Sequence, residues 1–250
     1  MALHLATRTT QFLVTESIEE NGFARLVEES SGQPMHADLF VPDPTSRQAL
    51  RLQPGDRVSG TPRGQRVEAP KLVEPAPPPE ALLVSSAVLI RRLEAFGLDI
   101  GVSAHAIAAS EWRRDRRQAT EAYPLLANVL RPQLALLFDW RPEHPMDDRK
   151  LIARLVEVTR RHLPDLEVLE ERDEDGELQH FRVRPEQLPI LLGEGEWEEP
   201  RGRYAPLIKF INKRLAESGV RERWMNTGAN WLFVEPALAQ MLTDAGLTLR

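Results

Sequence analysis

The first quarter of the chain alternates short apolar runs with turn-forming residues. Apolar and polar positions alternate with a period of two, which is typical of strands that bury one face. Turn formers such as Asn21-Gly22 and Arg63-Gly64 separate these runs. The pattern predicts five short strands, over residues 11–16, 23–29, 37–41, 56–60 and 65–73. Five short strands of this spacing indicate a small closed β-barrel within residues 1–74.

A proline-rich stretch, residues 75–81, interrupts this alternation. Its prolines favour an extended polyproline conformation and offer no continuous apolar face. We therefore expect a semi-rigid linker here, and a domain boundary.

Beyond the linker the hydrophobic period lengthens to that of helices. Residues 82–132 are predicted to form a helical segment, with helices over 82–96 and 106–122 and one or two further turns over 124–130. Residues 133–250 are predicted to form an α+β domain. Its expected elements are a buried strand at 133–140, a helix at 147–162, a hairpin of 166–172 and 177–184, a helix at 204–218, strands at 222–225 and 230–234, and a helix from Pro236.

Two groups of elements in this last region resemble each other. Leu151-Ile152 matches Leu207-Ile208, and the tripeptides that end in Pro185 and Pro236 also match. A proline at such a position suits the first residue of a helix. Residues 147–192 and 204–246 are therefore candidates for two repeated helix–hairpin–helix units, and the alternative is a chance likeness between common units.

Composition narrows the classes of function. The 250 residues are 42% hydrophobic, enough for real cores, and carry a net charge of −6, so nucleic acid would need a local basic patch. The absence of cysteine excludes disulfides and thiolate chemistry. Apolar runs stay well short of the roughly 18 residues of a membrane span, and the first ten residues lack an apolar leader segment. We expect a cytoplasmic protein with no membrane contact.

Four segments of the predicted barrel carry a recognisable motif. They are Asn21-Gly22-Phe23-Ala24-Arg25-Leu26, Asp38-Leu39-Phe40-Val41, Leu52-Gln53-Pro54-Gly55-Asp56-Arg57-Val58 and Arg63-Gly64-Gln65-Arg66-Val67. Together they resemble the cold-shock domain and its relative, the RNA-binding domain of the transcription terminator Rho. The resemblance covers about a quarter of the chain and implies a barrel of the oligonucleotide-binding (OB) type.

The resemblance also implies a site. In that family, aromatic rings on neighbouring strands stack on unpaired bases, and a basic rim follows the backbone. Phe23 and Phe40 stand at ring positions, and Arg63 and Arg66 are expected to hold the backbone of a single strand, with RNA favoured. Arg25 replaces a second ring of the first motif, and its guanidinium plane can also stack on a base.

The sequence departs from the family elsewhere. Glu16 stands where the cold-shock pattern has an exposed tryptophan, and Pro42 stands where a histidine ends its second motif. Residues 1–74 hold 8 basic and 10 acidic residues. These departures favour the alternative function, a regulatory adaptor whose barrel contacts another protein.

A second basic patch is predicted on the helix at 106–122. It consists of Trp112 with Arg113, Arg114, Arg116 and Arg117, a combination that can bind phosphates and stack on a base. The alternative is a solvated helix face with Trp112 packed inward.

The helix at 204–218 and the strands that follow it permit a third interpretation. They have the order of the recognition helix and wing of a winged-helix fold, in which Lys209, Lys213 and Arg214 would approach phosphates. Many unrelated α+β folds share this order.

Enzymatic readings find little support. Asp139, His144, Asp147 and Asp148 follow a predicted buried strand and could hold a divalent ion, but helix capping explains the last two. The sequence shows no catalytic constellation. We predict a non-enzymatic nucleic-acid-binding protein without a metal, cofactor or small-molecule substrate. Its expected fold is multi-domain, with an OB-like barrel, a linker, and an α+β region of helix–hairpin–helix units.

Overall fold

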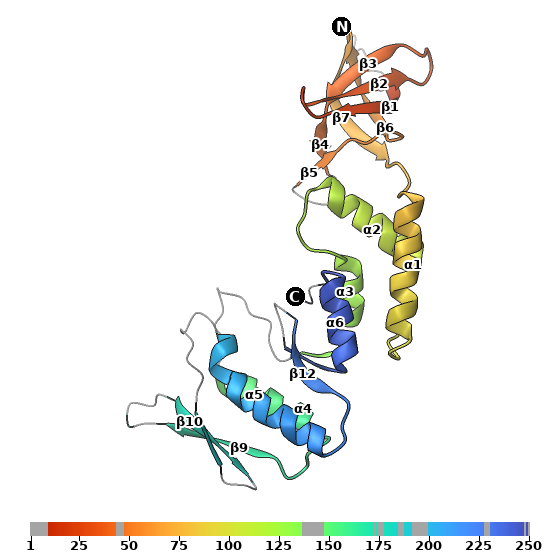
Figure 1. The fold of residues 1–250 in the computed structure, drawn as a ribbon. Coiled ribbons are helices and arrows are strands. Elements are labelled where there is room, and N and C mark those ends of the chain that lie inside the picture. The colour runs from red at the N-terminus through yellow and green to blue at the C-terminus, as the bar shows by residue number, and fades with distance from the viewer. Residues whose placement is uncertain are drawn as a thin grey trace, which may run out of the picture. The chain divides into compact units, whose positions relative to one another are not determined.

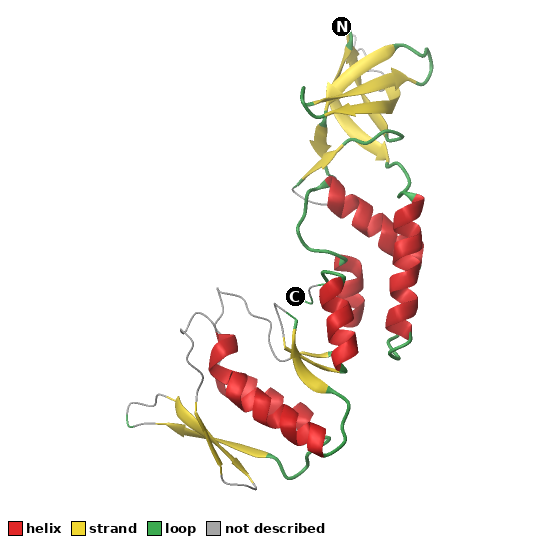
Figure 2. Cartoon of the chain, in the orientation of Figure 1, coloured by secondary structure: helices red, strands yellow, loops and turns green. Residues whose placement is uncertain are grey.

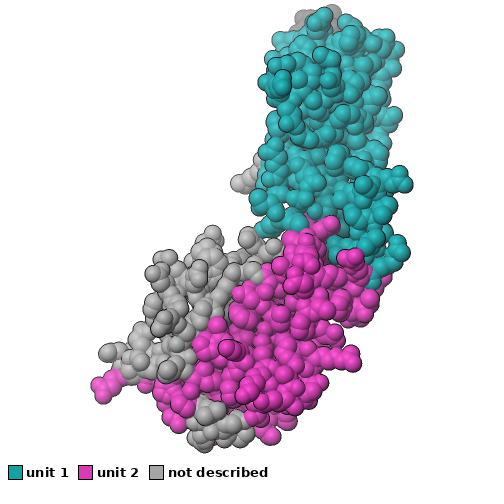
Figure 3. All heavy atoms as spheres, in the orientation of Figure 1, with its two compact units in different colours: residues 1–91, 102–122 teal, residues 92–101, 123–250 magenta. Residues whose placement is uncertain are grey.

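The computed structural model describes residues 10–43, 48–136, 148–172, 174, 178–184, 188–191, 200–227, 231–247 and 249. Internal contacts divide the chain into two compact units, distinguished by colour in Figure 3. Unit 1 comprises residues 1–91 and 102–122, and unit 2 comprises residues 92–101 and 123–250.

A closed five-stranded barrel forms the first part of unit 1 (Figures 1 and 2). Its strands are β1 (Thr10–Ile18), β2 (Phe23–Glu28), β3 (Pro34–Asp38), β6 (Arg57–Arg63) and β7 (Arg66–Glu74). They follow the order β1-β2-β3-β7-β6, and β6 pairs with β1 to close the barrel. Only β3 and β7 run parallel among these pairs. The predicted barrel is confirmed, and it is compatible with an OB-like fold.

The barrel closes because alternate side chains point inward. Phe12 and Val14 of β1 are buried, as are Ala24 and Leu26 of β2, while the residues between them face outward. Gly60 of β6 permits a close approach, since a Cβ there would lie 2.3 Å from Cγ1 of Val67. The period-two pattern in the sequence thus reflects a packed interior.

A small hairpin beside the barrel was not predicted. The sequence pattern indicated one strand at 37–41, whereas the structure has β3 ending at Asp38 and a separate β4 (Phe40–Pro42) paired with β5 (Ala49–Arg51). The single-strand prediction was wrong because Leu39 leaves the ladder. Its N–H donates to the Gly22 carbonyl at 3.0 Å and its carbonyl accepts from the Leu52 N–H at 2.8 Å.

The proline-rich stretch is attached to the barrel. Residues 75–79 form neither helix nor strand, as expected, but Ala76 is buried and its N–H donates to Oδ1 of Asp56 at 2.7 Å. The helices α1 (Glu80–Glu94) and α2 (Ala104–Arg116) follow. Ser103 caps α2, its Oγ accepting from the Ala106 N–H at 3.2 Å.

Unit 2 combines helices with two three-stranded sheets. Its elements are α3 (Pro124–Leu130), β8 (Ala135–Leu136), α4 (Asp148–Thr159), β9 (Glu167–Arg172), β10 (Leu178–Arg184), β11 (Leu188–Leu191), α5 (Pro200–Glu217), β12 (Arg223–Asn226), β13 (Trp231–Val234) and α6 (Pro236–Asp244). The sheets have the orders β11-β10-β9 and β12-β13-β8. Apolar residues of α4 and α5 share one core with Phe181 of β10 and Trp224 of β12.

One predicted element of unit 2 was wrong. The helix expected after Pro185 is replaced, over Leu188–Leu191, by strand β11, which pairs with β10. Pro189 is tolerated there because β11 is an edge strand, where a missing N–H breaks no central ladder. Residues 147–192 therefore do not form the helix–hairpin–helix unit inferred from the sequence. Most of the predicted buried strand, residues 137–140, lies outside the described residues.

No helix within the described ranges combines the length and the apolar character needed to cross a bilayer.

Candidate functional site

An outward-facing row of side chains crosses four strands of the barrel. In the strand register, Glu16 of β1 lies opposite Arg25 of β2, Arg25 lies opposite His36 of β3, and His36 lies opposite Arg66 of β7. Their neighbours along each strand point into the core. Adjacent strands lie about 5 Å apart, so the row offers a continuous polar strip.

Phe23 adds an aromatic ring next to this row. It begins β2, is half-buried, and lies opposite Asp38. Its ring centroid is 5.8 Å from that of His36, with 58° between the ring planes. Phe23 and His36 thus form a tilted aromatic pair, partly open to solvent, between Arg25 and Arg66.

The sequence reasoning missed His36. The signal was present, since His36 lies between two apolar residues, Met35 and Ala37, that the structure buries. Alternation would have placed the histidine outside, but the predicted strand began at residue 37. A strand boundary that is wrong by a few residues was enough to hide it.

Each predicted arginine of this face is paired with a carboxylate. Nη1 of Arg25 lies 2.8 Å from Oε2 of Glu16, and Nη2 of Arg66 lies 2.6 Å from Oδ1 of Asp38. Arg63 contacts Glu68 at 3.2 Å. These side chains are all well exposed, so the pairs contribute at most about 1 kcal/mol each. The face is balanced in charge, and its arginines can exchange partners at little cost.

Phe40 lies on the separate hairpin. Its side chain is 46% exposed, and its register partner is Arg51 of β5. The guanidinium of Arg51 is ion-paired with Glu19. The structure therefore leaves both predicted phenylalanines accessible but places only Phe23 on the barrel sheet, next to the row.

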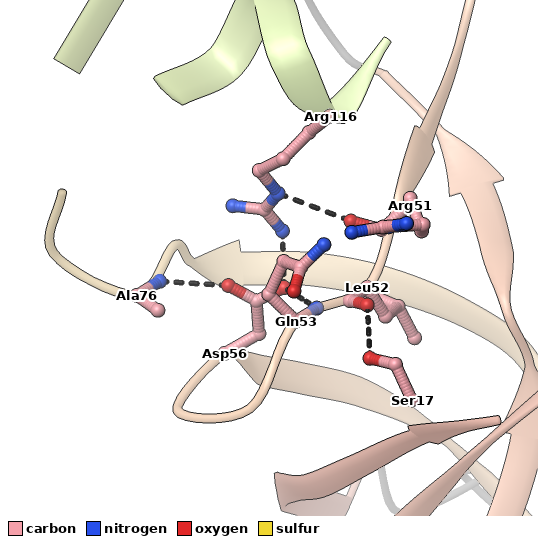
Figure 4. Close-up of polar contacts among 7 residues, drawn as sticks. All are labelled: Ser17, Arg51, Leu52, Gln53, Asp56, Ala76 and Arg116. Atoms are coloured by element: carbon pink, nitrogen blue, oxygen red, sulfur yellow. Dashed lines mark hydrogen bonds and ion pairs between the residues drawn. The ribbon is translucent and has the colours of Figure 1, made fainter. Parts of the chain in front are cut away.

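The second predicted patch is directed largely into unit 1. Arg116 is 2% exposed and its Nη2 is ion-paired with Oδ2 of Asp56, which is itself fully buried (Figure 4). Nε of Arg116 also donates to the Arg51 carbonyl at 3.0 Å. Burial lowers the pKa of Arg116, and the Asp56 carboxylate opposes that shift. Arg116 is thus an internal cation that joins α2 to the barrel.

Its neighbours on α2 follow the same tendency. Arg117 is ion-paired with the buried carboxylate of Asp43. Arg114 donates from Nε to Glu111 at 2.8 Å, and Trp112 is half-buried with its ring centroid 6.0 Å from Cζ of Arg116. Arg113 remains exposed. The sequence suggested a basic surface or a solvated face, but most of this run makes internal contacts.

The remaining candidates lie in unit 2. Lys209 and Lys213 are exposed on α5, Lys213 lies 3.8 Å from Glu217, and the side chain of Arg214 is 34% exposed. The proposed metal ligands Asp139, His144 and Asp147 lie outside the described residues, and Asp148 begins α4.

Comparisons of this chain with protein-family models, with curated proteins and with solved structures find no match.

Proposed function

We propose that the protein binds single-stranded nucleic acid, with RNA favoured, on the barrel face that holds Phe23, Arg25, His36 and Arg66. The observation that carries this proposal is the Phe23–His36 ring pair, set between two exposed arginines on adjacent strands. Rings on a strand face stack on unpaired bases, and OB-type barrels use the face of their second and third strands for this purpose. Phe40 on the neighbouring hairpin extends the platform by one further ring.

The charge balance of the face predicts weak, salt-sensitive binding. Arg25 and Arg66 must exchange Glu16 and Asp38 for phosphates, and those carboxylates stay nearby and oppose the anionic backbone. Stacking supplies about 1–3 kcal/mol per base, so two or three rings give affinities in the micromolar range at best. The same balance favours the competing function, a protein-binding adaptor, because alternating charges suit a partner of complementary charge.

The test is a fluorescence-anisotropy titration of labelled single-stranded RNA and DNA with the full chain at low and moderate salt. We expect binding at low salt that weakens as salt rises, because phosphate contacts release counterions. Phe23→Ala should weaken it roughly tenfold, the effect of one lost stacking contact. Phe96→Ala is the matched control, since Phe96 is also exposed but lies outside the barrel. No binding at tens of micromolar protein would refute the proposal and leave the adaptor function.

A further inference from the structure

A cavity of about 180 Å³ lies in unit 2, away from the barrel. Its walls come from the turn between α4 and β9, the end of β10, and the last turns of α5, elements that Figure 1 labels. The side chains of interest in its lining are His162, Asp165, Arg184, Phe210, Arg214 and Ser218.

The turn at 162–166 forms a fixed wall. Leu163 and Leu166 are buried in the core of unit 2. The Leu163 N–H donates to the Thr159 carbonyl at 2.9 Å, and Nε of Arg160 donates to the Leu166 carbonyl at 2.8 Å. A wall held by buried side chains and backbone hydrogen bonds gives the cavity a preformed shape, as ligand sites usually have.

The lining is predominantly cationic. Arg184 and Arg214 carry permanent positive charges, and Asp165 is the only carboxylate among the lining residues. Arg184 lies 3.3 Å from Glu167, and Nε of Arg214 lies 3.9 Å from Glu217, beyond hydrogen-bond distance. A guanidinium has five N–H donors, so one long contact leaves Arg184 able to bind a second oxyanion.

The other walls restrict the ligand further. Phe210 is half-buried and offers an apolar surface, and Ser218 adds a hydroxyl at the end of α5. The volume equals that of about six water molecules, which suits a phosphate with a small organic group rather than a dinucleotide. Lys209 and Lys213 are exposed one and two turns back along α5 and raise the local positive potential.

We propose that this cavity binds a phosphate group, held by Arg184 and Arg214, with the apolar part of the ligand against Phe210. The phosphate belongs either to a small phosphate ester or to a nucleic-acid backbone that passes over α5. Planar guanidinium forks match phosphate oxygens in pairs, which is why two arginines in one cavity favour this anion. This site is independent of the barrel face and does not rest on the function proposed for it.

Isothermal titration of the full chain tests the proposal with three probes: inorganic phosphate, AMP, and a short single-stranded oligonucleotide. Concentrations up to about 10 mM suit the small probes, because a single anchored phosphate gives millimolar affinity. Arg184→Gln should weaken binding about tenfold or more, the loss of one charge-assisted contact. Ser218→Trp, which fills the mouth of the cavity without changing its charge, should also abolish binding.

The matched control is Arg154→Gln. Arg154 is an exposed arginine of α4, paired with Glu157 at 2.9 Å, that does not line the cavity. Binding of phosphate and AMP that Arg184→Gln weakens and Arg154→Gln preserves would confirm a small-ester site. Oligonucleotide binding alone, sensitive to Arg184→Gln in a Phe23→Ala background, would confirm a backbone site. No binding of any probe, or binding that Arg184→Gln and Ser218→Trp leave unchanged, would overturn the proposal, whatever the barrel does.

Discussion

Asp56 of the barrel and Arg116 of α2 form a buried ion pair, 60 residues apart in sequence. The carboxylate has three partners, because it also accepts the backbone N–H groups of Gln53 at 2.8 Å and Ala76 at 2.7 Å (Figure 4). It therefore joins the loop before β6, the proline-rich stretch and α2 at one point. Unit 1 is held together by this contact as well as by apolar packing.

Removing the charge of Asp56 should destabilise unit 1 strongly. Asp56→Asn leaves the guanidinium of Arg116 buried without its counterion, which typically costs about 3–5 kcal/mol. Urea unfolding followed by circular dichroism measures the loss. Arg63→Gln, which breaks an exposed ion pair of the same barrel, is the control and should change the unfolding midpoint little. Equal effects of the two substitutions would contradict the role assigned to Asp56.

Gly60→Ala should destabilise the barrel for a steric reason. The new Cβ would lie 2.3 Å from Cγ1 of Val67 and 3.0 Å from the Glu68 carbonyl oxygen, so β6 and β7 must separate locally. Overpacking of this kind costs about 1–3 kcal/mol. Thermal unfolding is the measurement, and Ser59→Ala, the preceding residue of β6, is the control. An unchanged melting temperature in Gly60→Ala would show that the strands approach less closely than described.

Thr159→Val should weaken the core of unit 2. Oγ1 of Thr159 accepts the indole N–H of Trp224 at 3.0 Å, and both residues are almost fully buried. Valine preserves the shape but leaves that N–H without its partner, at a cost of about 1–3 kcal/mol. Chemical unfolding followed by tryptophan fluorescence measures it. Thr243→Val, which removes a partly buried hydroxyl bond to Ala239, should have a smaller effect.

Glu171 should contribute to stability in a pH-dependent way. Its pKa is held below the ordinary value of 4.5, first by the hydrogen bond from Arg182. A carboxyl group with a lower pKa in the folded state stabilises that state above its unfolded pKa, and the gain is lost as pH falls through the folded pKa. The stability difference between wild type and Glu171→Gln should therefore be largest near neutral pH and shrink in acid. Unfolding curves at several pH values test this, and a difference independent of pH would contradict it.

Much of the fold was accessible from the sequence because the relevant signals are local. The period-two runs around Phe12 and Val58 predicted the barrel strands, and the 3.6-residue period predicted the helices close to their observed bounds. Short elements were lost. The three-residue strands β4 and β5 carry too few alternations to register, and β11 was mistaken for a helix because Pro185 suits either context.

The site was less predictable because it depends on what lies opposite each residue. Phe23 and Arg25 were found from a motif, but their carboxylate and ring partners come from neighbouring strands through a register that the sequence does not specify. Arg116 shows the limit most clearly. In the sequence it belongs to an apparently exposed basic run, and only the fold reveals a buried carboxylate 60 residues away.

The most direct test of the central proposal is to map where single-stranded RNA contacts the chain. Ultraviolet cross-linking of the full chain to RNA, followed by trypsin digestion and mass spectrometry, reports the attachment site. Phe23 falls in the tryptic peptide of residues 9–25, while His36 and Phe40 fall in that of residues 26–47. We predict cross-links in these two peptides that decline in Phe23→Ala. RNA cross-linked only outside residues 9–47, or not at all, would contradict a binding site on the barrel face.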